Sequence, residues 1–459
     1  MVDSRVSSDR YFADVERLIA AGELQMAAER LNAIAQAAQA DPRLHMLGMQ
    51  LAEAAGNTKA ALESARRAVA RAPEWAPAAI NLALLHGRLN QFPEALAEAE
   101  RAVALAPKAL PVLKGAIEVA QRAGDAVRSA RWLDTALEME PSNDDYRVRL
   151  ALSLSAIGEH DRSLKMLDSM LEEAPSDTTL RETRALARTQ AGQTSGALAD
   201  WNALVEHAPD NAIWRYRRDI AAGNVPAAAP VELVSSMFDK LADVYDMHVL
   251  RSFRYRLPKD VADRILELHP DRKLNLLDLG CGTGLLGLML QRIDGAMIGV
   301  DASLKMIEKA AGHGFYNRFH HVDLMEALET TPESLYEAVA ALDVFIYVGD
   351  LSRAISNAYR ILTPGGRFFF SCEMLDGEAE SAWSLSAAGR YVHRRDYVLE
   401  CCAAAGFEPV VAQDVVLRQE AGAPVSGWLI EAVKPKAEPA RKKTRSRSTA
   451  TKKAGVSSG

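Results

Sequence analysis

The sequence has few cysteines and aromatic residues, and it has no long apolar run. Its four cysteines, in a chain of 459 residues, form no C-x-x-C pair and no set of paired spacings. We therefore expect neither a zinc site nor a disulfide framework, and no bound metal. No segment approaches the roughly 20 apolar residues that a membrane-spanning helix needs. The first ten residues are polar and lack the apolar stretch of a signal peptide, so we expect a cytoplasmic protein with no membrane partner.

Charge is distributed unevenly along the chain. The formal net charge is −7, yet residues 434–459 hold nine Lys or Arg against a single Glu. In this segment Ser and Thr alternate with the basic residues, and no aromatic side chain is present to stack on bases. We predict a disordered, basic, solubilising tail at 434–459, and we do not expect nucleic acid as a partner.

Prolines recur with a fixed period in the first half of the chain. They are 34 residues apart, at Pro73, Pro107, Pro141, Pro175 and Pro209. A second series with the same period consists of turn residues, namely Gly22, Gly56, Asn90, Gly124, Gly158 and Gly192. Proline cannot continue the helix before it, and Gly or Asn lets the chain reverse. Each 34-residue unit is therefore predicted to be an antiparallel pair of helices.

This pattern resembles the tetratricopeptide (TPR) repeat. The resemblance implies an all-α solenoid of about six repeats over residues 8–211, followed by a capping helix and linker at 212–230. It also implies a peptide or protein partner in the concave groove, although an array that only rigidifies or dimerises the protein remains an alternative. The expected groove positions have mixed sign: Lys114, Glu118, Arg122, Glu182 and Gln190. Arg184 and Arg188, on the first helix of one repeat, are expected to face solvent or a ligand.

Residues 274–284 read Leu-Asn-Leu-Leu-Asp-Leu-Gly-Cys-Gly-Thr-Gly. The apolar run with one acid, Asp278, predicts a buried parallel strand. The glycines that follow predict a tight turn opening a helix at Leu285. Because glycine has no β-carbon, a ligand can lie against the backbone amides there. The segment is therefore predicted to bind a ligand.

An acid two residues before a G-x-G-x-G run resembles the S-adenosylmethionine (SAM) loop of class I methyltransferases. On this resemblance the cofactor is SAM. The implied cofactor-binding residues in the loop are Asp278, Gly280, Cys281, Gly282 and Gly284.

Five apolar runs alternate with helical patterns from residue 274 onward, which predicts a parallel sheet with its ligands at the carboxyl ends of the strands. The runs are residues 274–279, 296–300, 318–322, 338–342 and 367–371. Two further β-rich runs, 409–418 and 425–433, predict an antiparallel hairpin at the sheet edge. Five parallel strands with a terminal hairpin are similar to the class I methyltransferase topology. We therefore expect an α/β Rossmann-like methyltransferase domain over residues 231–433.

Acids follow two of these predicted strands. Asp301, beside Ala302, ends the second strand, where a carboxylate can accept both hydroxyls of a ribose. The alternative is a helix N-cap, which Ser303 already offers. Asp323 ends the third strand, and the resemblance implies that it binds the adenine amine while Leu324 lies against the ring. Capping of the next helix is the alternative for Asp323.

Residues 237–246 are similar to the F-D-x-x-A-x-x-Y-D segment of quinone-biosynthesis methyltransferases. In that family the segment covers the cofactor, so Tyr245 is expected to close over SAM. Phe238 and Leu241 also fit the apolar face of an amphipathic helix. Residues 254–256 are expected to continue toward the substrate mouth.

Two residues are candidates for catalysis. Asp343 follows the fourth strand, where the family has an acidic residue near the cofactor. His393 is expected to open a helix over 393–405 and to act as a base near neutral pH, with a surface or capping role as the alternative. A base is optional for methyl transfer, because the sulfonium already activates the methyl group.

The predicted function is a SAM-dependent methyltransferase acting on a small molecule or on a protein that the solenoid recruits. One alternative is a scaffold whose SAM-binding domain no longer reacts. Another is an NAD(P)-binding reductase, because Gly282, Gly284 and Gly287 also form G-x-G-x-x-G with Asp301 about 20 residues further on. The acid at Asp278 and the terminal hairpin favour the methyltransferase.

Overall fold

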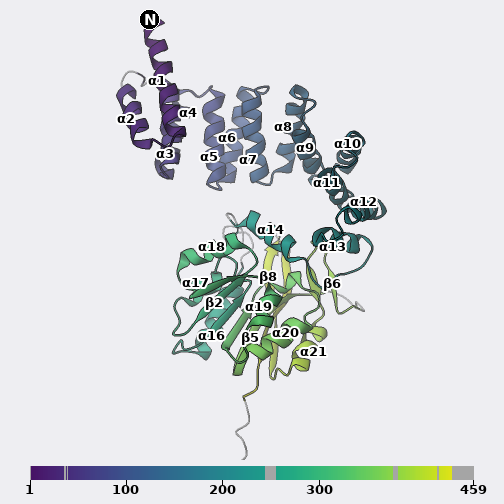
Figure 1. The fold of residues 1–459 in the computed structure, drawn as a ribbon. Coiled ribbons are helices and arrows are strands. Elements are labelled where there is room, and N and C mark those ends of the chain that lie inside the picture. Colours follow the sequence, from purple (N-terminus) through teal and green to yellow (C-terminus); the bar gives the residue numbers. More distant parts are fainter. Residues whose placement is uncertain are drawn as a thin grey trace, which may run out of the picture. The chain divides into compact units, whose positions relative to one another are not determined.

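The computed structural model describes residues 2–35, 38, 40–242, 245, 255–375, 381–420 and 423–436. It divides into two compact units, Met1–Asn224 and Val225–Gly459, each with its own core (Figure 1). Most of the predicted basic tail lies outside the described residues, as does Arg254. Among the described residues, no helix is long and apolar enough to cross a membrane.

The first unit consists of successive helix pairs. In its described residues the pairs are α1 and α2 (Val2–Ala20, Leu24–Ala35), α3 and α4 (Pro42–Ala54, Thr58–Arg71), α5 and α6 (Ala76–Arg88, Phe92–Leu105), α7 and α8 (Leu110–Arg122, Ala126–Met139), α9 and α10 (Asp144–Ala156, His160–Glu173), and α11 and α12 (Thr178–Gln190, Thr194–His207), followed by α13 (Ala212–Ala221). This array confirms the predicted TPR architecture.

The periodic residues have the predicted positions. Pro73 and Pro107 each lie two residues past the end of the second helix of a pair, and Gly56 and Gly124 turn the chain between helices with positive φ. Small residues stand where the helices touch: Ala27, Ala61, Ala95, Ser129 and Ala197 are at most 1% exposed. Neighbouring pairs therefore share a continuous core.

Two of the expected groove residues bind the preceding repeat instead of standing free. Arg122 donates to the carbonyl oxygen of Gly87 at 2.9 Å, and the side-chain oxygen of Gln190 accepts from the hydroxyl of Ser155 at 2.6 Å. Arg88 makes the equivalent link to Glu53 at 3.0 Å. These contacts tie the first helices of adjacent repeats together.

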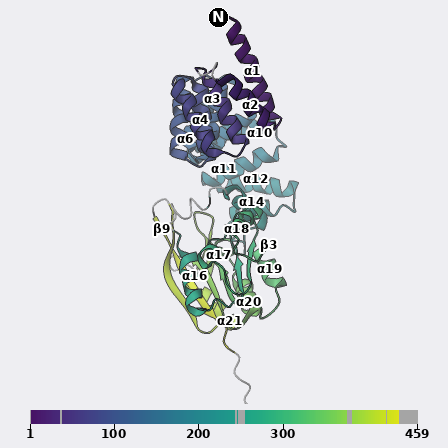
Figure 2. The same cartoon turned by 90° about the vertical axis from the view of Figure 1, so that its left-hand side faces the viewer.

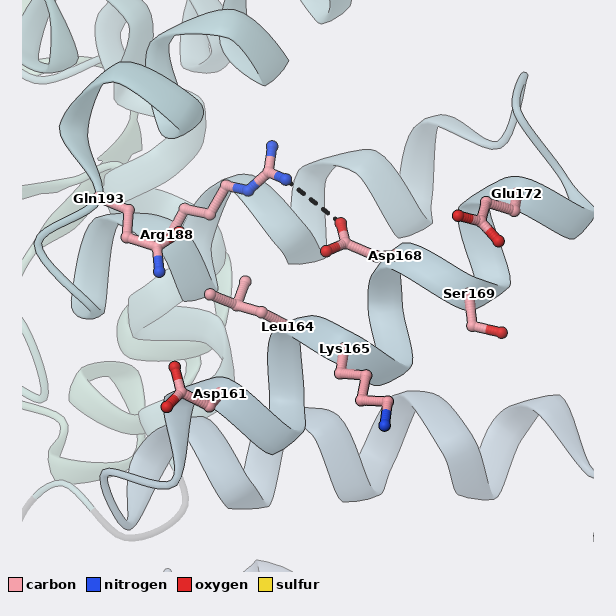
Figure 3. A pocket seen from close by; sticks show the side chains of 8 residues that line it. All are labelled: Asp161, Leu164, Lys165, Asp168, Ser169, Glu172, Arg188 and Gln193. Carbon is pink, nitrogen blue, oxygen red and sulfur yellow. Dashed lines mark hydrogen bonds and ion pairs between the residues drawn. The ribbon is translucent and has the colours of Figure 1, made fainter.

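Arg184 and Arg188 do not simply face solvent, contrary to the expectation from the sequence. Both bind Asp200, whose carboxylate is buried: Arg184 Nη2 lies 2.6 Å from its Oδ1, and Arg188 Nη1 lies 2.8 Å from its Oδ2. Arg188 also reaches Asp168 of α10 at 3.2 Å, beside a surface cavity of about 480 Å³ (Figure 3). The two arginines are required because Asp200 is buried and a buried carboxylate needs cationic partners.

The second unit is built on a seven-stranded sheet in the order β3-β2-β1-β4-β5-β9-β8. Strands β1 to β5 run parallel, β9 is antiparallel to β5, and β8 is antiparallel to β9. Their bounds are Leu276–Leu279, Met297–Asp301, Arg318–His321, Tyr336–Ala341, Leu362–Glu373, Val410–Glu420 and Ala423–Val433 for β1 to β5, β8 and β9. The predicted parallel sheet and its terminal hairpin are confirmed.

Helices cover both faces of this sheet (Figure 2). On one face α16 (Leu257–Leu268) and α17 (Leu285–Leu290) pack on apolar side chains of β1, β4 and β5. On the other face lie α19 (Leu324–Thr330), α20 (Ser352–Ile361) and α21 (Arg395–Ala405), against Phe368, Phe370 and Ile430. The short hairpin β6–β7 (Trp383–Leu385, Tyr391–His393) is separate from the main sheet. In parallel sheets with helices on both faces, ligands bind at the carboxyl ends of the strands.

We predict that Gly115 in α7 is essential for packing against α5. A β-carbon there would lie 2.6 Å from Cγ1 of Ile80, whereas one at Gly87 would meet only ordinary contacts at 3.8 Å. Gly115→Ala should lower the free energy of unfolding by about 1–3 kcal/mol through overpacking. Gly87→Ala, the matched control, should be neutral or stabilising by about 1 kcal/mol at most. Urea unfolding followed by far-ultraviolet circular dichroism measures both, and equal effects would contradict the prediction.

Candidate functional site

A cavity of about 370 Å³ lies where the parallel strands end. It collects the loops after β1, β2, β3 and β4, together with the segment that precedes the sheet. Its walls are formed by Ala228, Ala229, Val231, Val234, Phe238, Tyr245, Gly280, Gly282, Val300, Asp301, Ala302, Val322, Asp323, Leu324, Met325, Leu342, Asp343, Val344, Tyr347 and Val348. Most of the predicted cofactor residues therefore meet in one place, although they are far apart in the sequence.

The glycine loop forms the floor of the cavity. Gly280, Gly282 and Gly284 all have positive φ (65°, 52° and 85°), which side chains strain to adopt. A β-carbon at Gly280 would also clash with Val344 in the loop after β4. Gly284 is the N-cap of α17, which begins at Leu285 as predicted, but Gly284 does not line the cavity.

Asp278 lies behind this floor, beside a second cavity of about 40 Å³ that shares Tyr245, Gly280, Gly282 and Leu342 with the first. Its Oδ2 accepts a 2.6 Å hydrogen bond from the hydroxyl of Tyr316, and that hydroxyl accepts one from the amide of Gly287. Burial raises the pKa of Asp278 to about 7, against the opposing effect of the Tyr316 hydrogen bond. Cys281 is buried beside the same small cavity.

Asp301 joins the end of β2 to the glycine loop. Its Oδ2 accepts from the amide of Gly282 and its Oδ1 from the amide of Ser303, both at 2.8 Å. The cap of α18 (Leu304–His313) is Ser303, whose Oγ accepts from the amide of Met306. Burial raises the pKa of Asp301, whereas the two amides oppose this rise. A carboxylate can accept more than two hydrogen bonds, so Asp301 retains capacity toward the cavity.

Asp323 has the capping contact that was the alternative for it. Its Oδ1 accepts from the amide of Met325 at 2.7 Å, at the N-terminus of α19. The residue also lines the cavity, with Leu324 and Met325 beside it. Asp323 therefore caps α19 and lines the cavity at the same time.

Helix α14 (Val231–Leu241) covers part of the cavity. Asp239 accepts a 2.6 Å hydrogen bond from Ser303 Oγ and so ties α14 to the start of α18. The ring of Phe238 contacts those of Tyr245 and Tyr347 edge-on, at centroid distances of 5.9 and 5.7 Å, and all three line the cavity. Leu241 ends this helix, is 40% exposed and does not line the cavity.

Part of the predicted linker belongs to the cavity wall. Ala227 O accepts from the amides of Gly349 and Asp350 at 2.7 and 3.0 Å, and the amide of Ala229 donates to Tyr347 O at 2.9 Å. The segment 226–229 thus pairs with the loop after β4. Because both strands of this pairing line the cavity, the wall depends on contacts between residues more than 100 positions apart.

His393 is not where the sequence predicted it. It ends strand β7, and the next helix starts only at Arg395. Its side chain is fully buried and does not line the cavity, and Nε2 donates to the carbonyls of Val348 and Gly349 at 2.9 and 3.1 Å. Burial lowers the pKa of His393 to about 4. A neutral, enclosed imidazole supports the cavity wall, and nothing in this arrangement favours its use as a base.

Asp343 lines the cavity and is bound from behind. Arg418 of β8 donates from Nη1 to both of its carboxylate oxygens, at 3.1 and 3.0 Å. Arg418 also binds Glu373 and Glu420 at 2.6 Å each, and Arg390 of the β6–β7 turn binds the same two acids. Burial raises the pKa of Asp343, and Arg418 opposes that rise. Arg418 thus holds the Asp343 carboxylate in place from behind the cavity.

Tyr347, Val344 and Val348 lie in the segment 341–350 after the fourth predicted strand, where candidates were expected but only Asp343 was singled out, and Met325 was not predicted. These side chains follow β4 and β3 directly. The rule that ligands bind at the carboxyl ends of parallel strands could therefore have predicted them. Arg418 and Tyr316 were not predicted, and Glu373 was expected only as part of a candidate segment, 373–395. No local signal reveals those residues, since their partners are 38 to 75 positions away.

The strand order, the glycine floor and the carboxylates at successive strand ends define a cofactor-binding domain with class I methyltransferase topology. Residues 250–413 match a family model described as a methyltransferase domain. The C-terminal part of this chain thus matches a methyltransferase domain, in agreement with the SAM-dependent class that the sequence predicted for it.

Similar proteins include two curated methyltransferases. The chain is 35% identical over 140 residues to the demethylmenaquinone methyltransferase of Thermus thermophilus, which covers 28% of this chain and 61% of that protein. It is 30% identical over 146 residues to the mitochondrial ubiquinone biosynthesis O-methyltransferase of Mus musculus, covering 29% and 38%. The chain thus spans between about two fifths and three fifths of these relatives. A tetratricopeptide repeat protein from Parabacteroides merdae is similar in structure, with a TM-score of 0.37, 20% identity and coverage of 50% and 91%.

The raised pKa of Asp278 predicts a stability that depends on pH. Between pH 4 and 7 the folded protein holds a proton that the unfolded chain has lost, so stability should fall as pH rises through this window. The effect is at most about 4 kcal/mol, at 1.36 kcal/mol per pKa unit. Asp278→Asn has no carboxyl group to titrate at this position. The free energy of unfolding of the variant minus that of the wild type should therefore be larger at pH 8 than at pH 5.

Hydrogen exchange of amides in β1, measured at several urea concentrations at both pH values, reports this difference. The exposed carboxyl of Asp294, in Asp294→Asn, provides the control. If the difference between wild type and Asp278→Asn were the same at pH 5 and pH 8, the raised pKa would be wrong.

Proposed function

We propose that this protein transfers a methyl group from SAM to a small-molecule acceptor, and that the first unit recruits a peptide or protein partner. The observation that supports this best is the single cavity in which the glycine loop meets Asp301, Asp323 and Asp343. Each acid follows a different parallel strand, and only the fold brings them together.

The residues present fit the parts of SAM. Asp301 would accept the ribose hydroxyls, as a carboxylate at the end of the second strand does in such folds. Leu324, Met325 and Asp323 would hold the adenine, with apolar contact and an acceptor for its amine. The glycine loop, with Asp278 and the small cavity behind it, would hold the amino-acid end. When bound, SAM supplies a methyl group made electrophilic by its positively charged sulfur.

The chain's own contribution is to position the reactants and exclude water. Phe238 and Tyr245 cover the cavity from α14 and the residues after it, and Tyr347 and Val348 close it from the loop after β4. Most of these walls are apolar, which favours desolvation of the reacting centre. Alignment of donor and acceptor supplies much of the rate enhancement in such displacements.

The charge of the cavity argues against a nicotinamide dinucleotide. Three carboxylates are among the described residues that line it, and no Lys, Arg or His is among them. A dinucleotide pyrophosphate carries two negative charges, and the described lining offers it no cationic side chain. SAM carries a positive sulfonium, which the lining attracts.

The class of acceptor is proposed from the relatives. The two curated proteins are named as a ubiquinone biosynthesis O-methyltransferase and a demethylmenaquinone methyltransferase, so a hydroxylated or quinone-type ring is a suitable acceptor class here. The partner in the TPR groove is proposed from the fold of the first unit, since TPR solenoids present a concave surface for extended ligands. A catalytically silent SAM-binding scaffold is the second candidate, because His393 is enclosed outside the cavity and Asp343 is bound by Arg418.

We expect Asp301→Ala to abolish micromolar SAM binding in isothermal titration calorimetry of the full chain. The variant removes both the ribose acceptor and the contact that holds the Gly282 amide. Glu308→Ala removes an exposed acid of α18 outside the cavity and should bind SAM like the wild type. Retention of wild-type affinity in Asp301→Ala would rule out the proposed ribose site.

Turnover separates the enzyme from the scaffold. Incubation with radiolabelled SAM and a set of hydroxylated aromatic and quinol acceptors should produce labelled product and S-adenosylhomocysteine. The wild type should turn over at least tenfold faster than Asp301→Ala. Tight SAM binding with no labelled product from these acceptors or from a cell lysate would favour the scaffold.

A further inference from the structure

A second cavity of the C-terminal unit lies on the sheet face that α19 and α20 cover. Its volume is about 440 Å³, and its floor consists of Leu277, Ile298 and Val300. Helix α19 has only seven residues, so it leaves part of β2 and of the edge strand β3 uncovered. Parallel sheets are normally buried on both faces. The cavity is therefore a place where an apolar ligand can complete the cover of the sheet.

Most polar groups around this floor are already bonded. The hydroxyls of Thr330 and Thr331 each donate to a backbone carbonyl of α19 at 2.7 Å. The side-chain oxygen of Asn275 accepts from a backbone amide at 3.0 Å. These three side chains give the cavity its shape, and their bonded oxygens are not the groups that select a ligand.

Three other side chains of the lining keep free polar groups. Arg318 and His320 alternate along β3 and both line the cavity, and within the described residues neither side chain makes a hydrogen bond or ion pair. We call them the basic pair. Tyr336, at the start of β4, is only 6% exposed, and its hydroxyl has no hydrogen-bond partner among the described residues. Burial raises the pKa of Tyr336, which keeps this hydroxyl protonated.

The basic pair and Tyr336 lie at opposite ends of the apolar floor. In the order β3-β2-β1-β4, three strand spacings separate β3 from β4, or about 14 Å. No Asp or Glu is among the described residues of the lining. A matching ligand is an elongated apolar molecule with a carboxylate at one end, bound by the basic pair, and a hydrogen-bond acceptor at the other end, bound by Tyr336.

We propose that this second cavity is an effector site for an elongated apolar carboxylate. None of the loop glycines that line the first cavity lines the second, so a molecule bound there does not reach the proposed donor site. The two cavities nevertheless share Val300 and Val322, and α19 contributes Leu324 to the first and Ala327 to the second. A ligand at either site contacts elements that shape the other, so each ligand should change the affinity of the other by the same factor.

The first test measures binding of 6-methoxy-2-naphthoate to the full chain by calorimetry, without SAM. This probe has a carboxylate and an ether oxygen at opposite ends of a fused ring. Arg318→Gln should weaken binding about tenfold, because a charge-assisted hydrogen bond is lost. Tyr336→Phe should weaken it about fivefold and leave binding of 2-naphthoate, which lacks the ether, unchanged. Arg292→Gln removes an equal exposed charge outside both cavities and is the matched control.

A filling variant shows which cavity holds the probe. Ala296 lines the second cavity and not the first, so Ala296→Phe should abolish binding of both naphthoates. Its urea unfolding curve, compared with that of the wild type, verifies that the variant is folded. The proposal is overturned if the wild type binds neither acid, or if a folded Ala296→Phe and Arg318→Gln both bind 6-methoxy-2-naphthoate like the wild type.

The second test measures the coupling between the sites, and this step alone rests on the proposed function. The dissociation constant of SAM is determined with and without saturating 6-methoxy-2-naphthoate. We expect a change of at least about threefold in the wild type and none in Ala296→Phe. Equal constants in the wild type would overturn the effector role. If the wild type binds no SAM, the proposed function fails, whereas the first test still decides whether the acid site exists.

Discussion

The close approach of the glycine loop to the loop after β4 is the constraint on which the candidate site depends. Gly280 lies against Val344 so tightly that a β-carbon would clash, and positive φ at Gly280 and Gly282 turns the chain there. This approach makes the backbone itself the floor of the cavity. It also places Asp343, one residue before Val344, at the same opening. A side chain at Gly280 would separate the glycine loop from the loop after β4.

Around this floor, several residues serve the fold and the site together. Asp301 holds the amides of Gly282 and Ser303, and Asp323 caps α19, yet both line the cavity. Asp239 ties the covering helix α14 to the cap of α18. These acids can therefore have a structural role and a binding role together. Helices that start at the carboxyl edge of the sheet have their N-caps at the place where ligands bind.

The wall opposite the floor is built differently, from long-range contacts. Residues 226–229 pair with the loop after β4, and His393 supports the same loop from behind through the carbonyls of Val348 and Gly349. His393 shows how a residue with suitable chemistry for catalysis can have a structural role. An imidazole enclosed in this way stays neutral, because its protonation would place a charge where the side chain is closed off from solvent. The first unit offers a parallel case, since Arg184 and Arg188 neutralise the buried Asp200.

The sequence by itself determined the two-part architecture, the repeat register, the parallel strands with their terminal antiparallel hairpin, and the glycine loop with Asp278, Asp301 and Asp323. These features depend on local physics: a 34-residue period, apolar runs, residues that tolerate positive φ, and acids at strand ends. Only the tertiary structure decided that Tyr347 and Phe238 face one cavity, that Arg418 binds Asp343, and that His393 is enclosed. Those outcomes depend on which distant side chains meet when the sheet and its hairpins pack, and a partner 75 residues away leaves no periodic or compositional signal in the chain.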